Sequence, residues 1–248
     1  MKIGVFAYNF KHWKTQQGIQ NLILAGYKPE VILAADPVQL NFYQSKIRVS
    51  PKDLYLVHPK EIADRYEIPY KVVVHNSQET SDIVKNLKLD LGIILGARIL
   101  KPIAFENFTY GVLNMHPGML PENRGLDNIK WAILDDKQQG VTVHLIDETI
   151  DRGKLLIKES IKIYKDDTLV DLNIRIQNLE QRLMIECVNN IESFLVKNNP
   201  QSLILLESHI MEHVSLQARE EVEEELRPEI EEQAQQFGGQ LPQEAQMQ

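Results

Sequence analysis

The first half of the chain alternates short runs rich in β-branched and aromatic residues with segments of helical periodicity. Residues 91–95 form a continuous apolar run, which is typical of a strand buried on both faces of a sheet. This alternation predicts an α/β fold with a mostly parallel sheet and covering helices. The expected strands are residues 2–7, 31–35, 70–74 and 91–95, and the expected helices are residues 15–25, 60–67 and 77–87.

The second half continues with strands expected at residues 111–114 and 141–146. Residues 154–163 could add an antiparallel strand, and residues 167–196 carry a long helical pattern. Apolar residues recur there every three or four positions, so one face of the helix is expected in the core. Cys187 lies on that face and is the only cysteine, so no internal disulfide can form. We interpret it as a buried apolar side chain rather than a reactive thiol.

The net charge of −8 is confined to the C-terminal part of the chain. Residues 210–248 carry ten acidic and two basic side chains, so the preceding 209 residues balance to zero. Nucleic-acid binding is driven largely by neutralisation of phosphates, and a body without excess positive charge does not predict it. The charge pattern divides the chain into a body of residues 1–209 and an acidic tail of residues 210–248.

The acidic tail has a weak helical pattern. Its apolar residues recur every fourth position, a spacing that drifts around a helix of 3.6 residues per turn. We expect a short, solvated acidic helix that frays into disorder, with docking on a partner or a second subunit as the alternative. The tail and the long helix of residues 167–196 could form a dimer interface, so we keep a homodimer as an alternative.

The composition also restricts the compartment. No run of about 18 apolar residues occurs that could span a bilayer. The N-terminus lacks the long apolar run of a signal peptide and reads as the beginning of the first strand. A single cysteine suits a reducing compartment, so we expect a cytoplasmic protein with no membrane partner.

Polar side chains follow two of the expected strands in the second half. Asn114 and His116 stand two positions apart, so on an extended backbone they point the same way. A loop rich in proline and glycine follows them. The next strand runs into a loop that contains Asp151. If the two strands are neighbours, Asp151 can approach His116 at a sheet edge of the kind where ligands bind.

Three linked motifs in this region resemble the folate-dependent formyltransferase family. They read Asn-x-His-Pro-x-x-Leu-Pro-x-x-Arg-Gly from Asn114, Gly-Val-Thr-Val-His-x-x-Asp from Gly140, and Ile-Asp-x-Gly from Ile150. The resemblance extends in order and spacing over residues 3–194 and is strongest over residues 90–153. It implies a Rossmann-like sheet, a catalytic domain within residues 1–209 and a cis peptide bond before Pro121.

The family resemblance also implies the roles of individual residues. Asn114, His116 and Asp151 match the catalytic three of the family. The co-substrate would be 10-formyltetrahydrofolate, and no metal is expected. The positions that match the folate pocket and the loop closing over it are Gly96, Ala97, Arg98, Ile99, Leu100, Ile146, Asp147, Glu148, Thr149 and Ile150.

Formyl transfer suits the chemistry of these side chains. Attack of an amine on the formyl carbon creates an oxyanion, and a proton must pass from the amine to the departing folate nitrogen. A protonated His116 could face the oxyanion, and Asn114 could donate a hydrogen bond to it. Asp151 would favour the protonated imidazole and help to order a water. We interpret His144, on the following strand, as a structural residue.

Departures from the family pattern restrict the range of acceptors that this chain is expected to use. Glycinamide ribonucleotide formyltransferases carry a short Gly/Ser/Asn turn after the first strand, whereas residues 8–15 here are aromatic and basic. Methionyl-tRNA formyltransferases have a sizeable C-terminal RNA-binding domain, whereas residues 210–248 are few and acidic. Formyltetrahydrofolate hydrolase is expected to carry an N-terminal regulatory domain, whereas Met1 here precedes the first strand directly.

By elimination we expect a small amine as acceptor, and specifically a nucleotide-linked amino sugar. Its phosphate would bind a helix start with Lys11 and Lys14, and its base would stack on Trp13 or Phe10. The alternative is that Trp13 packs the helix and the lysines are solvated. Arg124 either holds the catalytic loop or touches the acceptor. Hydrolysis of formyltetrahydrofolate, the two other acceptors named above, and a non-catalytic folate-binding or interaction module stay as alternatives.

Overall fold

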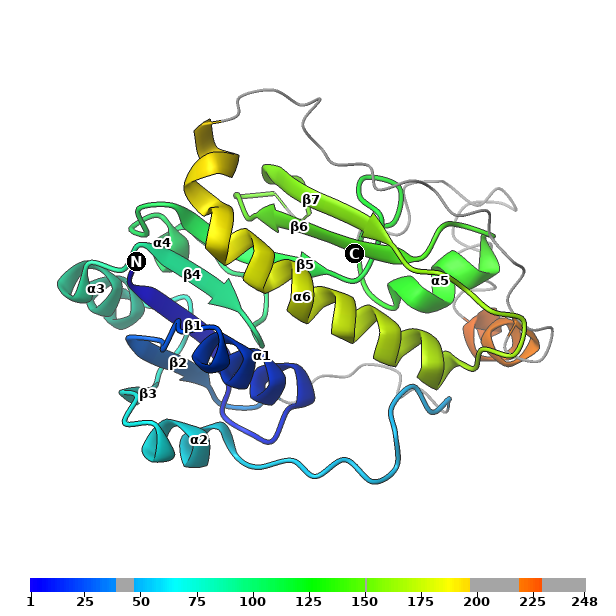
Figure 1. The fold of residues 1–248 in the computed structure, drawn as a ribbon, viewed down its shortest axis with the longest axis horizontal. Helices are drawn as coiled ribbons and strands as arrows, with labels where there is room; N and C mark the ends of the chain where they lie inside the picture. The colour runs from blue at the N-terminus through cyan, green and yellow to red at the C-terminus, as the bar shows by residue number, and fades with distance from the viewer. Residues whose placement is uncertain (39–46, 150, 197–218, 229–248) are drawn as a thin grey trace.

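A seven-stranded sheet forms the centre of the protein, in the order β3-β2-β1-β4-β5-β6-β7 (Figure 1). The computed structural model describes residues 1–38, 47–149, 151–196 and 219–228. The sheet is parallel from β3 through β5, whereas β6 and β7 pair antiparallel. This confirms the expected mostly parallel α/β sheet. The strands are β1 (Ile3–Tyr8), β2 (Val31–Ala35), β3 (Tyr70–Val72), β4 (Leu91–Ile94), β5 (Gly111–His116), β6 (Gly140–Leu145) and β7 (Leu155–Ser160).

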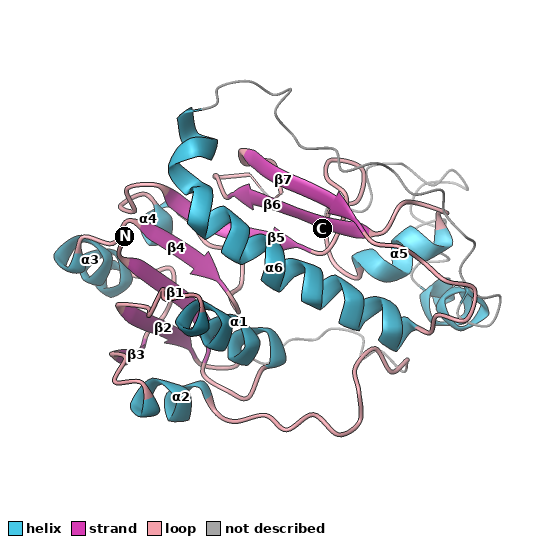
Figure 2. Cartoon of the chain, in the orientation of Figure 1, coloured by secondary structure: helices cyan, strands magenta, loops and turns pink. Residues whose placement is uncertain are grey.

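Helices cover both faces of this sheet (Figure 2). On one face, residues of α1 and α6 such as Ile19 and Leu183 pack against Val5 of β1. On the other face, Phe6 of β1 packs with Val84 of α3. Successive strand residues thus enter opposite cores, as the two-residue period of a strand requires. The helices are α1 (Trp13–Leu24), α2 (Pro59–Arg65), α3 (Gln78–Leu87), α4 (Pro102–Phe105), α5 (Asn128–Leu134) and α6 (Leu169–Val196).

Most element bounds lie within two residues of their predictions. The largest difference in the described sheet concerns the edge strand β7, which is shorter than the expected residues 154–163. The strand expected at residues 111–114 continues to His116, so both polar side chains of the motif lie on regular β5. Cys187 is confirmed as a buried side chain, and its burial raises the pKa of the thiol. The peptide bond between Leu120 and Pro121 is cis, as the family resemblance implied.

The acidic tail contributes a helix that packs against the body. Residues 219–228 are helical, and we call them the tail helix. Val222 and Leu226 are buried in a small cluster with Ile133 of α5 and Leu172 of α6. The expected short helix is therefore present, but Val222 and Leu226 on one face of it are buried rather than solvated. The predicted boundary at residues 209–210 and the tail beyond residue 228 lie outside the described residues.

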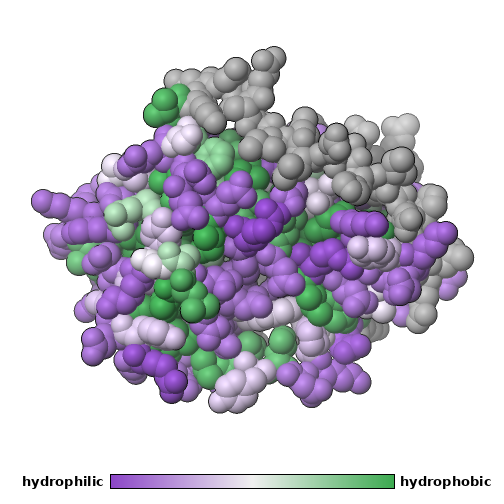
Figure 3. Space-filling model, viewed as in Figure 1, coloured by the Kyte–Doolittle hydropathy of each residue, from purple (hydrophilic) through white to green (hydrophobic). Residues whose placement is uncertain are grey.

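The surface in Figure 3 is mainly hydrophilic, with hydrophobic residues showing between the polar ones. Within the described ranges, no helix is long and apolar enough to cross a membrane.

Candidate active site

The end of β5 carries the two polar side chains of the first motif. Leu113 and Met115 alternate with them and lie in the core on the α1 and α6 side of the sheet. Asn114 and His116 therefore point to the opposite face. Val112 shares that face and packs in the second core cluster. The apolar residues of β5 thus determine the side of the sheet on which the polar ones lie.

His116 is held in a buried position. It is 4% exposed, and its Nε2 lies 2.7 Å from the backbone carbonyl oxygen of Asn123, to which it donates. Burial lowers the pKa of the imidazole, and this effect outweighs the opposing effect of the Asp151 carboxylate. The ring is therefore neutral near pH 7, with its proton on Nε2. Its Nδ1 lies 3.6 Å from Oδ1 of Asp151.

Asp151 reaches the site from the loop after β6. Its backbone adopts a positive φ of 52°, and its Oδ2 accepts a hydrogen bond from the amide of Gly125 at 3.3 Å. Nε of Arg124 donates to the backbone carbonyl of Asp151, also at 3.3 Å. This contact fits the loop-holding role considered for Arg124. These contacts tie the loop after β5 to the loop after β6.

His144 joins this cluster, although the sequence alone did not predict its contact with Asn114. It lies opposite Asn114 in the antiparallel pairing of β5 with β6. Its Nε2 is 3.1 Å from Nδ2 of Asn114 and 3.7 Å from Oδ1 of Asp151. Burial lowers the pKa of the His144 imidazole, with Asp151 opposing. The Gly-Val-Thr-Val-His motif carried a signal for this residue, but only the strand register shows which residue it faces.

The loop between β5 and α5 shapes the surroundings of His116. A Cβ on Gly118 would lie 2.7 Å from the carbonyl oxygen of Asn123 and 2.9 Å from Nε2 of His116, so glycine permits their close approach. Oγ1 of Thr142 on β6 donates to the Gly118 carbonyl at 2.7 Å and accepts from the amide of Leu120 at 3.0 Å. The loop is therefore fastened to the neighbouring strand.

Three of the residues predicted for the folate pocket share one apolar cluster. Ala97, Leu100 and Ile146 pack with Val112, on the same face of the sheet as Asn114. Gly96 is buried and lies against Tyr8, so that a Cβ at this position would be only 2.8 Å from the Tyr8 ring.

The other predicted folate residues lie nearer the solvent. Arg98 and Ile99 are exposed, as are Asp147, Glu148 and Thr149. Oδ1 of Asp147 accepts hydrogen bonds from both the amide and the hydroxyl of Thr149, which closes a local turn. Ile150 lies outside the described residues.

The predicted acceptor residues occupy the start of α1. Trp13 is its first residue and is half-buried, and Lys11 is exposed. Nζ of Lys14 lies 2.7 Å from Oε1 of the buried Glu180 on α6 and 2.9 Å from the carbonyl oxygen of Met115. These two groups hold the ammonium of Lys14, so its expected role in binding a phosphate is not supported.

An aromatic group connects the acceptor segment with the folate segment. Tyr8 and Phe10 stack with ring centroids 4.8 Å apart, and the ring of His12 meets Tyr8 edge-on. The Tyr8 hydroxyl donates to the carbonyl of Ala97 at 2.9 Å. Burial lowers the pKa of His12 to about 4, so this ring is neutral.

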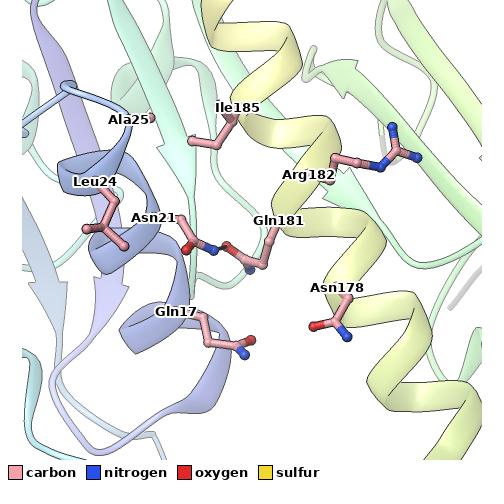
Figure 4. A pocket seen from close by; sticks show the side chains of 8 residues that line it. All are labelled: Gln17, Asn21, Leu24, Ala25, Asn178, Gln181, Arg182 and Ile185. Carbon is pink, nitrogen blue, oxygen red and sulfur yellow. Dashed lines mark hydrogen bonds between the residues drawn. The ribbon is translucent and has the colours of Figure 1, made fainter.

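A separate hollow of about 580 Å³ lies between α1 and α6 (Figure 4). Gln17 and Asn21 line it from α1, and Asn178 and Gln181 line it from α6. It opens on the face of the sheet opposite to Asn114. In the part of the chain that the structure describes, histidine, cysteine and carboxylate side chains form no group of three that could hold a metal ion.

Formyltransferases are among the known proteins with similar sequences and folds. The family pattern described as formyl transferase matches residues 19–188. The methionyl-tRNA formyltransferase of Kosmotoga olearia is 33% identical over 145 residues, which cover 57% of this chain and 47% of that protein. The chain thus spans about half the length of this curated relative.

Solved structures show the same fold. Phosphoribosylglycinamide formyltransferase from Anaplasma phagocytophilum superimposes with a TM-score of 0.61 at 16% identity, over 86% of this chain and 96% of that chain. A 4-N formyltransferase from Francisella tularensis gives a TM-score of 0.53 at 18% identity, over 88% of this chain and 77% of that one. At such identities the likeness shows the fold alone.

Proposed function

Because the chain belongs to the formyl transferase family, we propose that it transfers a formyl group from 10-formyltetrahydrofolate to an amine. The observation that carries this proposal is the convergence of Asn114, His116 and Asp151 around the end of β5. A neutral imidazole, an amide and a carboxylate are groups that can move a proton and stabilise a developing oxyanion.

His116 acts as the proton acceptor in this proposal. Its Nε2–H is fixed on the Asn123 carbonyl, so the unprotonated Nδ1 can take the proton of the attacking amine. The imidazolium that results stabilises negative charge on the formyl oxygen and returns the proton to the departing nitrogen. Asp151 beside Nδ1 raises the pKa of the ring and so favours the protonated form during the reaction.

Asn114 supplies a neutral hydrogen bond to the formyl oxygen. One N–H of its amide is directed to Nε2 of His144, which orients the group, and the amide has a second N–H. Loss of such a donor costs about 2.7–4 kcal/mol in comparable sites. His144 is a positioning residue in this scheme.

The folate would bind beside these groups, on the same face of the sheet. The residues present fit a pterin ring, because Ala97, Leu100 and Ile146 form an apolar cluster next to backbone groups of the segment that follows β4. When bound, 10-formyltetrahydrofolate supplies the activated formyl group. The exposed side chains of Arg98 and Thr149 would lie toward its polar end.

The acceptor proposal is a small amine that carries phosphate, and specifically a nucleotide-linked amino sugar. The first turn of α1 contains no acidic residue, and the side chain of its N-cap residue His12 makes no capping hydrogen bond. Such a helix start attracts anions. Lys11 is exposed beside it, and the half-buried Phe10 offers a ring for a base. Methionyl-tRNA is the second candidate, because the curated relative named above acts on that acceptor.

The test is turnover of 10-formyltetrahydrofolate with separate acceptors. We would follow release of tetrahydrofolate with 4-amino sugar nucleotides, methionyl-tRNA, glycinamide ribonucleotide and buffer alone. Turnover that needs one amine and is lost in His116→Gln supports the transferase and identifies its acceptor. Turnover in buffer alone would instead assign a hydrolase. If His116→Gln retains full turnover, the catalytic proposal is wrong.

The phosphate site has its own test. Lys11→Ala should raise the KM for a phosphate-bearing acceptor and leave the KM for folate unchanged. Lys71→Ala is the matched control, because Lys71 is an exposed lysine on the edge strand β3. Equal effects of both substitutions would contradict a phosphate site at the start of α1.

A further inference from the structure

The tail helix packs against α5, and Figure 1 shows it next to one end of α5. Oε1 of Glu225 lies 2.7 Å from Nζ of Lys130 on α5, and the two side chains are only 4% and 5% exposed. Oε2 of Glu225 also accepts from the amide of Ile47 at 2.9 Å. At the C-terminal end of α5, Arg219 donates to the carbonyl of Leu134 at 3.3 Å.

Lys130 carries its positive charge in this buried ion pair. Burial acts to lower the pKa of Lys130, but its hydrogen bonds to the Glu225 and Asp127 carboxylates and their negative charges outweigh burial and leave the pKa raised. Val222 and Leu226 add an apolar contact between the tail helix and α5 and α6. A buried charge pair combined with buried apolar residues makes this a built interface rather than a surface contact.

The beginning of α5 continues this connection to the candidate active site. Nδ2 of Asn128 donates to the carbonyl of Gly125 at 2.8 Å, and the carbonyl of Asn128 accepts from Nδ2 of Asn123 at 3.0 Å. The carbonyl of Asn123 in turn holds Nε2 of His116, and the amide of Gly125 holds the carboxylate of Asp151. Both polar groups of the site are thus positioned by the loop that α5 anchors.

We propose that the tail helix is a positioning element for the active site, acting through Lys130 and α5. Docking of Glu225 and Val222 fixes α5, and α5 fixes the two loop groups that hold His116 and Asp151. Release of the tail helix therefore loosens the bond between His116 and Asn123. The tail helix then contributes to the geometry of the active site. The kinetic consequence of this proposal rests on the proposed formyl transfer.

The test uses the full chain and two releasing variants. Glu225→Gln removes the charge that faces Lys130, and Val222→Asp places a charge in the apolar cluster. Glu224→Gln is the matched control, because Glu224 is exposed on the same helix and loses the same charge. Hydrogen exchange over residues 219–228 reports whether the tail helix is docked. Nitrogen NMR of labelled histidine, assigned with His116→Gln, reports the tautomer of His116 without folate or acceptor.

In the wild type and Glu224→Gln we expect a slowly exchanging Nε2 proton on His116. In the releasing variants this proton should exchange at least about tenfold faster, and kcat should fall by about 10- to 100-fold with the folate KM within twofold. If a released tail helix leaves both the ring proton and kcat within twofold of wild type, the proposal is wrong. An equal loss in Glu224→Gln would overturn it as well. If Val222→Asp does not fold, Glu225→Gln decides by the same readouts. Failure of formyl transfer in the wild type would remove the proposed function and leave the NMR result valid.

Discussion

Replacing Lys14 by methionine would leave a buried carboxylate without its cation. Glu180 is 3% exposed on the side chain, and Nζ of Lys14 lies 2.7 Å from its Oε1. Burial raises the pKa of Glu180, and Lys14 opposes that rise. Without the lysine, the folded protein should bind a proton at Glu180 rather than keep the charge. Lys14→Met should therefore destabilise the fold by an amount that depends on pH.

The magnitude follows from the cost of protonation. In the unfolded chain a glutamate has a pKa of about 4.3, so holding it neutral at pH 7 costs about 3.7 kcal/mol, at about 1.4 kcal/mol per pH unit. This agrees with the roughly 3–5 kcal/mol expected when one partner of a buried pair is removed. The folded variant binds more protons than the unfolded one above pH 4.3, so its stability falls as pH rises. At pH 5 the same argument leaves only about 1 kcal/mol.

Urea unfolding of the wild type and Lys14→Met at pH 5, 6 and 7 measures this difference. The double variant Lys14→Met/Glu180→Gln is the control, because it has no ionisable group at the pair. Its loss of stability relative to the wild type should not depend on pH. It should be about 1 kcal/mol, because the Met115 carbonyl no longer receives the lysine hydrogen bond. A penalty for Lys14→Met that is equal at pH 5 and pH 7 would refute the reasoning.

Three further predictions concern the site and the core. Gly118→Ala should lower turnover by at least about tenfold, because the added methyl displaces the Asn123 carbonyl from His116, and steady-state kinetics with unchanged folate affinity would show it. The rate of formyl transfer should fall on the acid side with a midpoint below about pH 6.5, because burial lowers the pKa of His116 and only the neutral ring accepts a proton. Asp151→Asn should lower that midpoint further, and a wild-type midpoint above pH 6.5 would contradict the scheme. Cys187 should react with a thiol reagent only as fast as the chain unfolds, and fast labelling of the native protein would contradict its burial.

The sheet could be predicted from sequence because each buried strand is a local apolar run. The catalytic three could be proposed because Asn114 and His116 share a strand, and because the spacing to Asp151 resembles a family pattern. Both inferences use short-range order. The expected bounds of β4 and β2 needed no information from the rest of the chain.

Long-range partners could not be predicted in this way. Glu180 is 166 positions from Lys14, and nothing local distinguishes that lysine from a solvated one. His144 acquires its contact with Asn114 only through strand register. The four-residue spacing of the apolar residues in the tail predicts a pattern that drifts around a helix, and most of that pattern lies outside the described residues. A helix of residues 219–228 needs only Val222 and Leu226, one turn apart, to bury one face.

The alternation along β5 also limits how this protein can change over evolutionary time. Insertion or deletion of a single residue before Asn114 would turn the polar side chains toward α1 and α6 and bring Leu113 or Met115 to the catalytic face. A single insertion or deletion would therefore disrupt both the packing of the core and the catalytic site. We therefore expect length variation among related sequences to be excluded from β5. A library that varies loop lengths to alter the acceptor should leave this strand at its present length.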